Sequence, residues 1–285
     1  PLPEDGFSFQ NNKPNGVNLG CATIHQGGIV QAPDGKWWGV SMQDFNAVGR
    51  TVCLSPITWV DGWPYFGLEK NLGRSPRTWF KPNDAVKAPQ APYDRCDDFS
   101  GKTFKGVWQW NHNPDNLLWT LTERPGYLRL KTGKVVKNLF EARNTLTQRT
   151  EGPKCSGVIS LDLTFMNDGD HAGLAAFCSE PGILSVVKEY GKKYLVMTDR
   201  NVEKARRELN QDIVFLKMEC DFTTDYAQFS YSLDDTNWTP IGDKFHMIFS
   251  MAHFTGNKFA IFNYATKAAG GYVDVDFFRY EKQSN

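Results

Sequence analysis

The 285-residue chain balances 32 Lys and Arg against 32 Asp and Glu, and 14% of its residues are aromatic. A neutral chain without a basic run argues against nucleic acid or an anionic membrane as a partner. No apolar stretch approaches the roughly 18 residues of a membrane helix. The high aromatic content, which includes nine tryptophans, suits carbohydrate contact or a β-rich core.

The N-terminal sequence PLPEDGFSFQNNKPNG lacks an initiator Met and a charged-then-apolar leader, so we expect a cleaved, processed or truncated N terminus. Short segments of alternating apolar and polar residues follow, separated by Gly, Asn, Asp and Pro, which is typical of all-β folds. Only residues 202–209 (VEKARREL) are compatible with a short helix, or with a solvated loop. The segments predicted to form strands are 28–30, 37–42, 51–54, 127–130, 158–165, 172–177, 194–197, 213–218, 227–232, 259–262 and 272–280.

A linker is predicted where residues 81–92 (KPNDAVKAPQAP) hold three prolines and no apolar pattern. We therefore expect a first domain at 1–82, a linker at 83–92 and a second domain at 93–285. The first domain has about six strand-sized segments, too few to close a propeller whose blades need four strands each. Because an open fragment leaves strand edges unpaired, we expect it to complete a propeller with a preceding polypeptide.

The cysteines are widely spaced, without a CxxC pair, which argues against zinc and redox motifs. They are either free buried thiols or members of one or two disulfides, and the sequence leaves both readings open. They are Cys21, Cys53, Cys96, Cys155, Cys178 and Cys220.

The residues from 25 to 82 mix His, Gln, Arg and Asp with tryptophans between the predicted strands. Aromatic faces beside bidentate polar groups are what a sugar-binding cleft needs, because a sugar ring offers C–H bonds for stacking and hydroxyls for hydrogen bonds. His25 lies in IHQGG and Arg50 in AVGRTVCLSP, while SMQDFN holds Gln43, Asp44 and Phe45. A core histidine and a surface arginine are the structural alternatives for the first two.

Two segments resemble parts of glycoside hydrolase family 43, the β-xylosidase and α-L-arabinofuranosidase family. The stretch HQGGIVQAPDGKWWGVSMQDFNAVGRTVCLSPITWVDGWPYFGLEKNLGRSPRTWFKP resembles the last part of its five-bladed propeller. The motifs DDFSG, WQWNHNPDN, LWTLTERPGYLRL, FEARNTLTQR, FSYSLDDTNWTPIG and VDVDFFRY resemble the concanavalin A-like domain attached to many β-xylosidases of the family. The implied fold is all-β: a partial five-bladed β-propeller (its last blades) followed by a concanavalin A-like β-sandwich.

The resemblance implies roles for several of these residues. His25 would lie on the propeller axis beneath the sugar, binding a water-shelled metal ion or steadying a catalytic carboxylate. Arg50 would reach the substrate hydroxyls and a carboxylate that tunes the acid. Gln43, Asp44 and Phe45 are weaker candidates for the pocket wall. In FTGNKFAIF, Phe259 matches a phenylalanine that related sandwiches insert into the active site, with Phe254 as the alternative.

Domains resembling this sandwich often hold a structural calcium ion between the first and last strands. Asp97 and Asp98 open the first strand, and Asp274 and Asp276 lie in the last. Residues two apart in a strand point to the same face, so Asp274 and Asp276 would offer paired oxygens, which suit calcium. Solvated edge charges are the alternative, and the expected cofactor is calcium.

Enzymes of this family invert the anomeric centre with two carboxyl groups about 6.5–9.5 Å apart. Glu4 and Asp5 lie in an unpatterned leader, and Asp44 has no acidic partner at a plausible spacing. Glu123 and Glu141 belong to the sandwich. We therefore expect the catalytic carboxylates on an upstream half and this chain alone to be inactive.

The expected function is part of an exo-acting hydrolase of xylan- or arabinoxylan-derived oligosaccharides, a β-xylosidase or an α-L-arabinofuranosidase. The alternatives are a non-catalytic carbohydrate-binding sandwich and a sandwich that only braces a propeller. The expected partners are a xylo- or arabino-oligosaccharide and the upstream half. The expected location is secreted or periplasmic, with cytoplasmic as the alternative.

Overall fold

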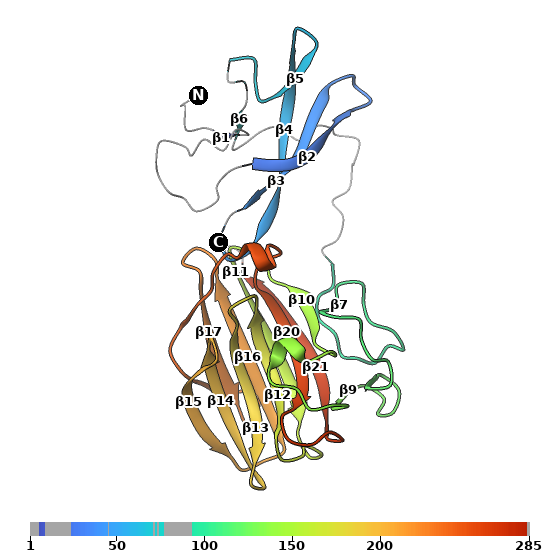
Figure 1. Cartoon of the computed structure of the whole chain (residues 1–285), viewed down its shortest axis with the longest axis vertical. Helices are drawn as coiled ribbons and strands as arrows, with labels where there is room; N and C mark the ends of the chain where they lie inside the picture. The colour runs from blue at the N-terminus through green and yellow to red at the C-terminus, as the bar shows by residue number, and fades with distance from the viewer. Residues whose placement is uncertain are drawn as a thin grey trace. The chain divides into compact units, whose positions relative to one another are not determined.

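The structure is a computed structural model of the chain, and it describes residues 6–8, 24–44, 46–70, 72, 74–76 and 93–283. The chain divides into two compact units, residues 1–92 and 93–285 (Figure 1). The expected linker at 83–92 lies outside the described residues. Within the described ranges, regular structure is strand apart from two single-turn 3-10 helices, which confirms the all-β class. None of the helices in this part of the chain is long and apolar enough to cross a membrane.

The first unit contains a four-stranded antiparallel sheet in which each strand pairs with the next along the chain. Two further short strands pair with each other, at Gly6–Ser8 and Arg74–Pro76. A four-stranded meander is the unit from which propeller blades are built. The strands are β1 (Gly6–Ser8), β2 (Ile24–Gln31), β3 (Trp37–Asp44), β4 (Arg50–Val60), β5 (Trp63–Phe66) and β6 (Arg74–Pro76).

The second unit is a sandwich of two antiparallel sheets. The order of the first sheet is β15 (Val202–Leu209), β14 (Lys192–Asp199), β13 (Gly182–Glu189), β12 (Asp170–Phe177), β20 (Lys258–Ala265), β10 (Leu146–Arg149) and β7 (Gln109–Trp110). The order of the second is β18 (Trp238–Pro240), β17 (Tyr226–Ser232), β16 (Ile213–Asp221), β11 (Lys154–Asp162), β21 (Tyr272–Gln283), β9 (Leu128–Lys131) and β8 (Trp119–Thr120), and β19 (Phe245–His246) also pairs with β17.

The core lies between these sheets, whose central strands β11, β12 and β20 are buried along almost their whole length, while β16 alternates buried and less buried residues. In β16, Val214, Leu216 and Met218 are fully buried, while the residues between them are partly exposed. The close approach of aromatic side chains also requires a glycine at position 157. A Cβ atom there would stand 2.7 Å from the Phe259 ring and 3.0 Å from the Phe278 ring.

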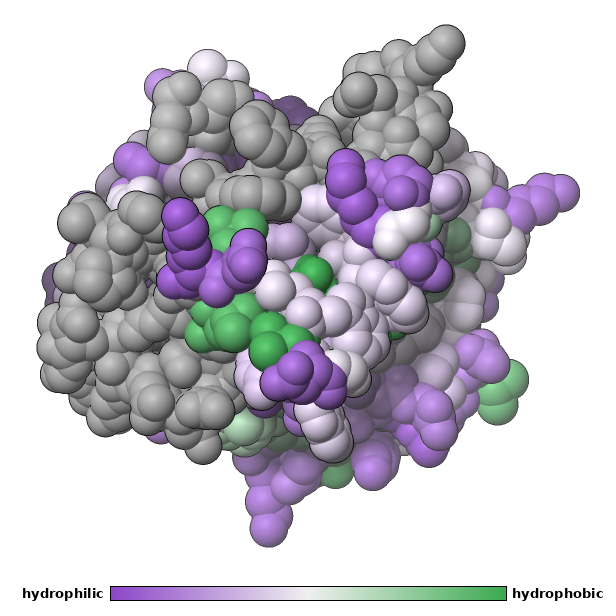
Figure 2. Space-filling view, turned by 90° about the horizontal axis from the view of Figure 1, so that it is seen from above, coloured by the Kyte–Doolittle hydropathy of each residue, from purple (hydrophilic) through white to green (hydrophobic). Residues whose placement is uncertain are grey.

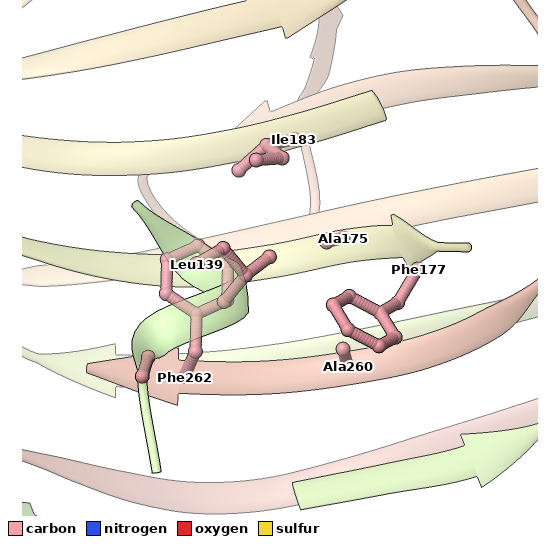
Figure 3. Close-up of a cluster of buried hydrophobic side chains, with 7 residues drawn as sticks. Leu139, Ala175, Phe177, Ile183, Ala260 and Phe262 are labelled. Atoms are coloured by element: carbon pink, nitrogen blue, oxygen red, sulfur yellow. The ribbon is translucent and has the colours of Figure 1, made fainter. Parts of the chain in front are cut away.

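A second buried cluster covers the other face of the first sheet. The 3-10 helix η2 (Leu139–Glu141) packs Leu139 against Phe177 of β12, Ile183 of β13 and Phe262 of β20 (Figure 3). Asn138 caps the helix by accepting hydrogen bonds from the backbone N–H groups of Phe140 and Glu141. The other helix, η3 (Met251–His253), is capped in the same way by Ser250.

The expectation of a helix or loop at 202–209 is wrong, because this segment is strand β15. It lies at the edge of the first sheet, where only one side pairs, with β14. Its exposed Glu203 forms an ion pair with the half-buried Arg206 at 2.9 Å. An edge strand rich in charge discourages pairing with other chains, and the same charges obscure the alternation from which strands are recognised.

The cysteine question is answered for the described residues, in which Cys53, Cys96, Cys155, Cys178 and Cys220 are free thiols. Cys21 lies outside the described residues. Three of the thiols, Cys155, Cys178 and Cys220, are buried in the sandwich.

Asp170, at the start of β12, is fully buried, and its Oδ1 has no hydrogen-bond partner within the described part of the chain. Burial raises its pKa from 3.8 to about 6. An acid whose pKa is raised on folding contributes stability that is complete below about pH 4 and is lost as the pH rises through about 6. We therefore expect Asp170→Asn to be more stable than the parent at pH 7 by up to about 3 kcal/mol.

Urea unfolding at pH values from 4 to 7 would check this. The difference in the free energy of unfolding between parent and variant should grow with pH, whereas Asp168→Asn, two residues away, serves as the control. Parallel pH profiles for the parent and Asp170→Asn would contradict the prediction.

Candidate functional site

The strongest cluster of charged and polar groups in the first unit lies where β3 ends and β4 begins. Asp44 and Arg50 are directly opposite each other in the ladder. The Arg50 guanidinium donates from Nε to Asp44 Oδ1 over 2.6 Å, and the two side chains are only 12% and 6% exposed. A charge-assisted hydrogen bond shielded from water fixes the direction of the guanidinium.

Gln26 is a third member of this cluster, which the sequence analysis did not single out. Its Oε1 accepts a hydrogen bond from Arg50 Nη1 over 3.4 Å. Gln26 has a φ of 49° and is the extra residue of a β-bulge between His25 and Gly27. Bulges re-aim side chains and recur beside active sites. In the sequence, the glycine after Gln26 was the available signal of this bulge. Only glycine fits there, because a Cβ at Gly27 would stand 2.1 Å from the Val40 carbonyl oxygen.

Gln43 lies on the opposite face of the same strand end. It is buried, and its Oε1 accepts a weak hydrogen bond from Cys53 Sγ at 3.8 Å. Within the described part of the chain, its Nε2 has no hydrogen-bond partner, and the same is true of Ser41 Oγ and Trp38 Nε1. Buried polar atoms are nearly always hydrogen-bonded in complete folds, so this sheet carries unused hydrogen-bonding capacity.

One face of the four-stranded sheet is apolar and open to solvent. Residues directly opposite one another, or two apart in one strand, share a face. By this register, the face that carries Asp44 and Arg50 also carries exposed Val30, Val40, Val52, Leu54, Val60, Trp63 and Tyr65. Val52 is 79% exposed and Trp63 is 71% exposed. Seen from above in Figure 2, hydrophobic residues reach the surface beside strongly hydrophilic ones.

Two other residues predicted for this site, His25 and Phe45, lie partly or wholly outside the described residues. The backbone of His25 pairs with Met42 in the β2–β3 ladder, but its side chain lies outside the described residues, as does Phe45. The structure thus brings together Arg50 and Asp44, adds Gln26, and places Gln43 on the other face.

Phe259 is wrong as a substrate contact, because it is a core residue of the sandwich. It is 0% exposed and packs edge-to-face on Phe278 and Tyr280, with ring centroids 5.6 and 6.0 Å away. The alternative, Phe254, is 45% exposed at the end of η3. Between these two, Phe254 is the side chain that a second surface can reach.

The four aspartates expected to bind calcium do not fit that ion. Asp274 accepts hydrogen bonds from Arg129 Nε at 2.7 Å, Arg129 Nη2 at 2.9 Å and Arg124 Nη1 at 3.0 Å. The oxygens of Asp97 accept from Trp108 Nε1 and the Phe99 backbone N–H. Two guanidinium groups on one carboxylate already supply the positive charge that calcium would bring.

Asp276 is also close to an arginine, because the charge of Arg124 acts on its carboxylate. Ile159 pairs with Phe278 and Leu161 with Val275, so β21 has an extra residue between these positions. Asp98 instead accepts hydrogen bonds from Ser100. No cluster of three or more His, Cys, Asp or Glu side chains able to hold a metal occurs among the described residues.

We expect the thermal unfolding midpoint of the sandwich to be the same in EDTA and in excess calcium. Asp274→Ala should lower the midpoint, because it leaves two arginines without their buried counter-charge. Differential scanning calorimetry measures both effects. A midpoint that rises with calcium in the parent and not in Asp274→Ala would overturn this assignment.

A second expectation concerns the Arg50–Asp44 pair. Asp44→Asn removes the charge but keeps the shape, so Arg50 loses its charge-assisted hydrogen bond and the hairpin end becomes less stable. Amide hydrogen exchange should speed up by about tenfold in residues 37–44 and 50–60 and stay unchanged in the sandwich. Asp34→Asn, which breaks the exposed Asp34–Lys36 pair in the same unit, is the matched control. Equal exchange in both variants would contradict the expectation.

Comparison with known proteins identifies the family to which the chain is similar. A family model described as the beta xylosidase C-terminal concanavalin A-like domain matches residues 96–281. A β-xylosidase of Formosa agariphila is 34% identical over 90% of this chain and 47% of its own length. A non-reducing end α-L-arabinofuranosidase of Bacteroides ovatus is 36% identical over 69% of this chain and 38% of its own length.

Solved structures agree with this fold. A protein of Bacteroides eggerthii described as a bifunctional GH43-CE protein matches 93% of this chain and 35% of its own, with 42% identity and a TM-score of 0.81. An engineered GH43 glycoside hydrolase, described as having endo-xylanase and exo-arabinofuranosidase activity, matches with 34% identity and a TM-score of 0.82 over 56% of its own chain.

The chain thus spans about half or less of the length of these proteins. The blade-like sheet and the sandwich follow one another in the order that the sequence resemblance implied. On the match over residues 96–281, the chain belongs to the family of glycoside hydrolase family 43 β-xylosidase C-terminal concanavalin A-like domains.

Proposed function

We propose that this chain is the C-terminal part of an inverting, exo-acting glycoside hydrolase. Its substrates would be xylan- or arabinoxylan-derived oligosaccharides, as for a β-xylosidase or an α-L-arabinofuranosidase. The names of the relatives support the substrate class. The chain would contribute the last propeller blade, the Arg50 cluster and the sandwich, while the catalytic carboxylates would come from an upstream half.

One observation carries this proposal: the face of the four-stranded sheet that holds Arg50 exposes apolar side chains on all four strands, from Val30 on β2 to Tyr65 on β5. An exposed contiguous apolar face marks an interaction surface. In a propeller, the neighbouring blade covers such a face. We infer that the occupant is a preceding blade of the same enzyme.

The role proposed for Arg50 follows from its geometry. Asp44 holds the guanidinium through Nε, and Gln26 takes one hydrogen from Nη1. In the intact enzyme the N–H donors of this guanidinium, which number five, would also reach a sugar hydroxyl or a carboxylate of the upstream half. Because the group is pre-oriented, little conformational entropy is lost when it binds. Arg50 would then position the substrate and favour the ionised form of a neighbouring acid.

The proposed location is outside the cytoplasm, secreted or periplasmic, where polymer-derived oligosaccharides are first met. The alternative is cytoplasmic action on imported oligosaccharides.

A second function, a carbohydrate-binding sandwich without catalysis, rests on a different observation. A cavity of about 240 Å³ in the sandwich is lined by Asp115, Arg143, Asn263 and Tyr264, among others. Asn263 donates from Nδ2 to the Leu130 carbonyl, and its Oδ1 has no partner in the described residues. Sugar binding by the chain alone, abolished by Arg143→Ala, would favour this function.

The leading proposal predicts that the chain alone does not hydrolyse nitrophenyl β-xyloside or nitrophenyl α-L-arabinofuranoside. The intact enzyme, in which the upstream half precedes this sequence, should hydrolyse at least one of them. In the intact enzyme, Arg50→Ala should lower kcat/KM by about 10²–10³-fold, the loss typical of a buried donor that stabilises the transition state, and Arg50→Lys should lower it less.

Lys36→Ala is the control, because Lys36 lies in the same unit but forms an exposed ion pair. Steady-state kinetics with both substrates gives the comparison. Turnover by the purified chain alone would refute the division of labour, and an intact Arg50→Ala enzyme with unchanged kcat/KM would refute the role of Arg50.

A further inference from the structure

Two of the buried thiols of the sandwich are direct neighbours across a strand pair. Cys155 of β11 and Cys220 of β16 occupy opposite positions in the antiparallel ladder. Directly opposite residues in such a ladder have Cα atoms roughly 4.5–5.5 Å apart. A disulfide requires a Cα separation of about 4.4–6.8 Å, so the backbone already has the spacing of a cross-linked pair.

The two side chains also share the core face of their sheet. Cys220 lies on the same side of β16 as Val214, Leu216 and Met218, and Cys155 faces it across the ladder. Both thiols are buried, with relative exposures of 2% and 3%. A cavity of about 200 Å³ is lined by both cysteines and by Lys154, Asp221 and Gln228. The pair is therefore buried but adjoins a space that a small reagent can enter.

We propose that Cys155 and Cys220 form a covalent modification site, a dithiol that a disulfide oxidant converts into an intramolecular disulfide. The thiolate of Cys155 attacks one sulfur of the oxidant, forms a mixed disulfide and releases one oxidant thiolate. The thiolate of Cys220 then attacks Cys155 Sγ, forms the Cys155–Cys220 bond and releases the second oxidant thiolate. The two protons from the cysteines go to the released thiolates, so the protein loses two electrons and two protons and the oxidant gains them.

The order of attack follows from the environments of the two sulfurs. A hydrogen bond with Cys220 lowers the pKa of Cys155, and the Glu151 backbone N–H also donates to Cys155 Sγ at 3.5 Å. The hydrogen bond with Cys155 and burial raise the pKa of Cys220 well above its ordinary value. The thiolate is the attacking species, so Cys155 is the first nucleophile and Cys220 the resolving thiol.

The other described thiols lack this arrangement. Cys178 accepts a hydrogen bond from the Glu180 backbone N–H and donates to the Glu180 carbonyl. Cys96 is exposed, and its sulfur contacts the backbone of Tyr280. Cys178 therefore provides a buried control and Cys96 an exposed one.

The test uses the full chain, reduced with dithiothreitol and then equilibrated with oxidised glutathione under native conditions. Remaining thiols are alkylated during denaturation, and the peptides are mapped without reduction. Trypsin leaves Cys155 and Cys178 in one peptide, since no Lys or Arg lies between 155 and 187. A protease that cuts at aspartate separates them, because Asp162, Asp168 and Asp170 lie in between.

We expect one linked peptide pair that joins Cys155 to Cys220, with a mass about 2 Da below that of the two reduced peptides. Cys178→Ser should leave this link intact. Cys220→Ala should abolish it and leave Cys155 as a glutathione mixed disulfide. Because a cross-link restricts the unfolded chain, oxidised parent should unfold several degrees higher than reduced parent, and this difference should vanish in Cys220→Ala.

Free Cys155 and Cys220 after Cys96 has been fully glutathionylated would overturn the proposal. Glutathione retained on Cys155 in the parent would overturn it too, since Cys220 would then fail to resolve the mixed disulfide. Circular dichroism of Cys155→Ala and Cys220→Ala shows whether the variants fold, and the parent measurement stands on its own if they do not.

Discussion

A β-sheet has two faces, and an apolar face is stable in water only where another layer covers it. The two units of this chain meet that requirement differently. In the sandwich, each sheet covers the inner face of the other, and η2 covers part of an outer face with Leu139. In the first unit, a single four-stranded sheet leaves valines, leucine and aromatic rings exposed on one face. Hydrophobic burial is the dominant favourable term in folding, so a covering layer on this face would stabilise the first unit.

The Arg50 cluster lies on that same face, at the strand ends. Its ion pair with Asp44 and the bulge at Gln26 are local features, made within one hairpin and its neighbour strand. They give the guanidinium a fixed direction before any partner arrives. In the proposed enzyme, the apolar face would supply affinity for the preceding blade and the polar strand ends would contact the substrate, so one sheet would serve both assembly and the site.

The sequence predicted those strands whose formation depends on the local pattern of apolar, polar, Gly and Pro residues. The alternation in 213–218 identified the core strand β16, and the Gly- and Pro-bounded segments identified the blade. It failed where distant contacts decide the outcome. The charges in 202–209 hid a strand, since its edge position depends on β14 rather than on its own residues. The oxygens of Asp274 could not be assigned from sequence, because Arg124 and Arg129 approach them from about 150 residues away along the chain. Phe259 sits on the core side of β20, where a one-residue change of register would reverse its direction.

The position of β21 in its sheet has a consequence for how the sandwich is made. Tyr272–Gln283 pairs with β11 on one side and with β9 on the other, so this strand lies inside the second sheet although it follows the other strands of that sheet along the chain. During synthesis, β9 and β11 are made before β21. Each therefore has one edge without a partner strand until these twelve residues emerge from the ribosome. Release of this segment is therefore the event that closes the sheet, and a chaperone that shields open strand edges would act in the interval before it.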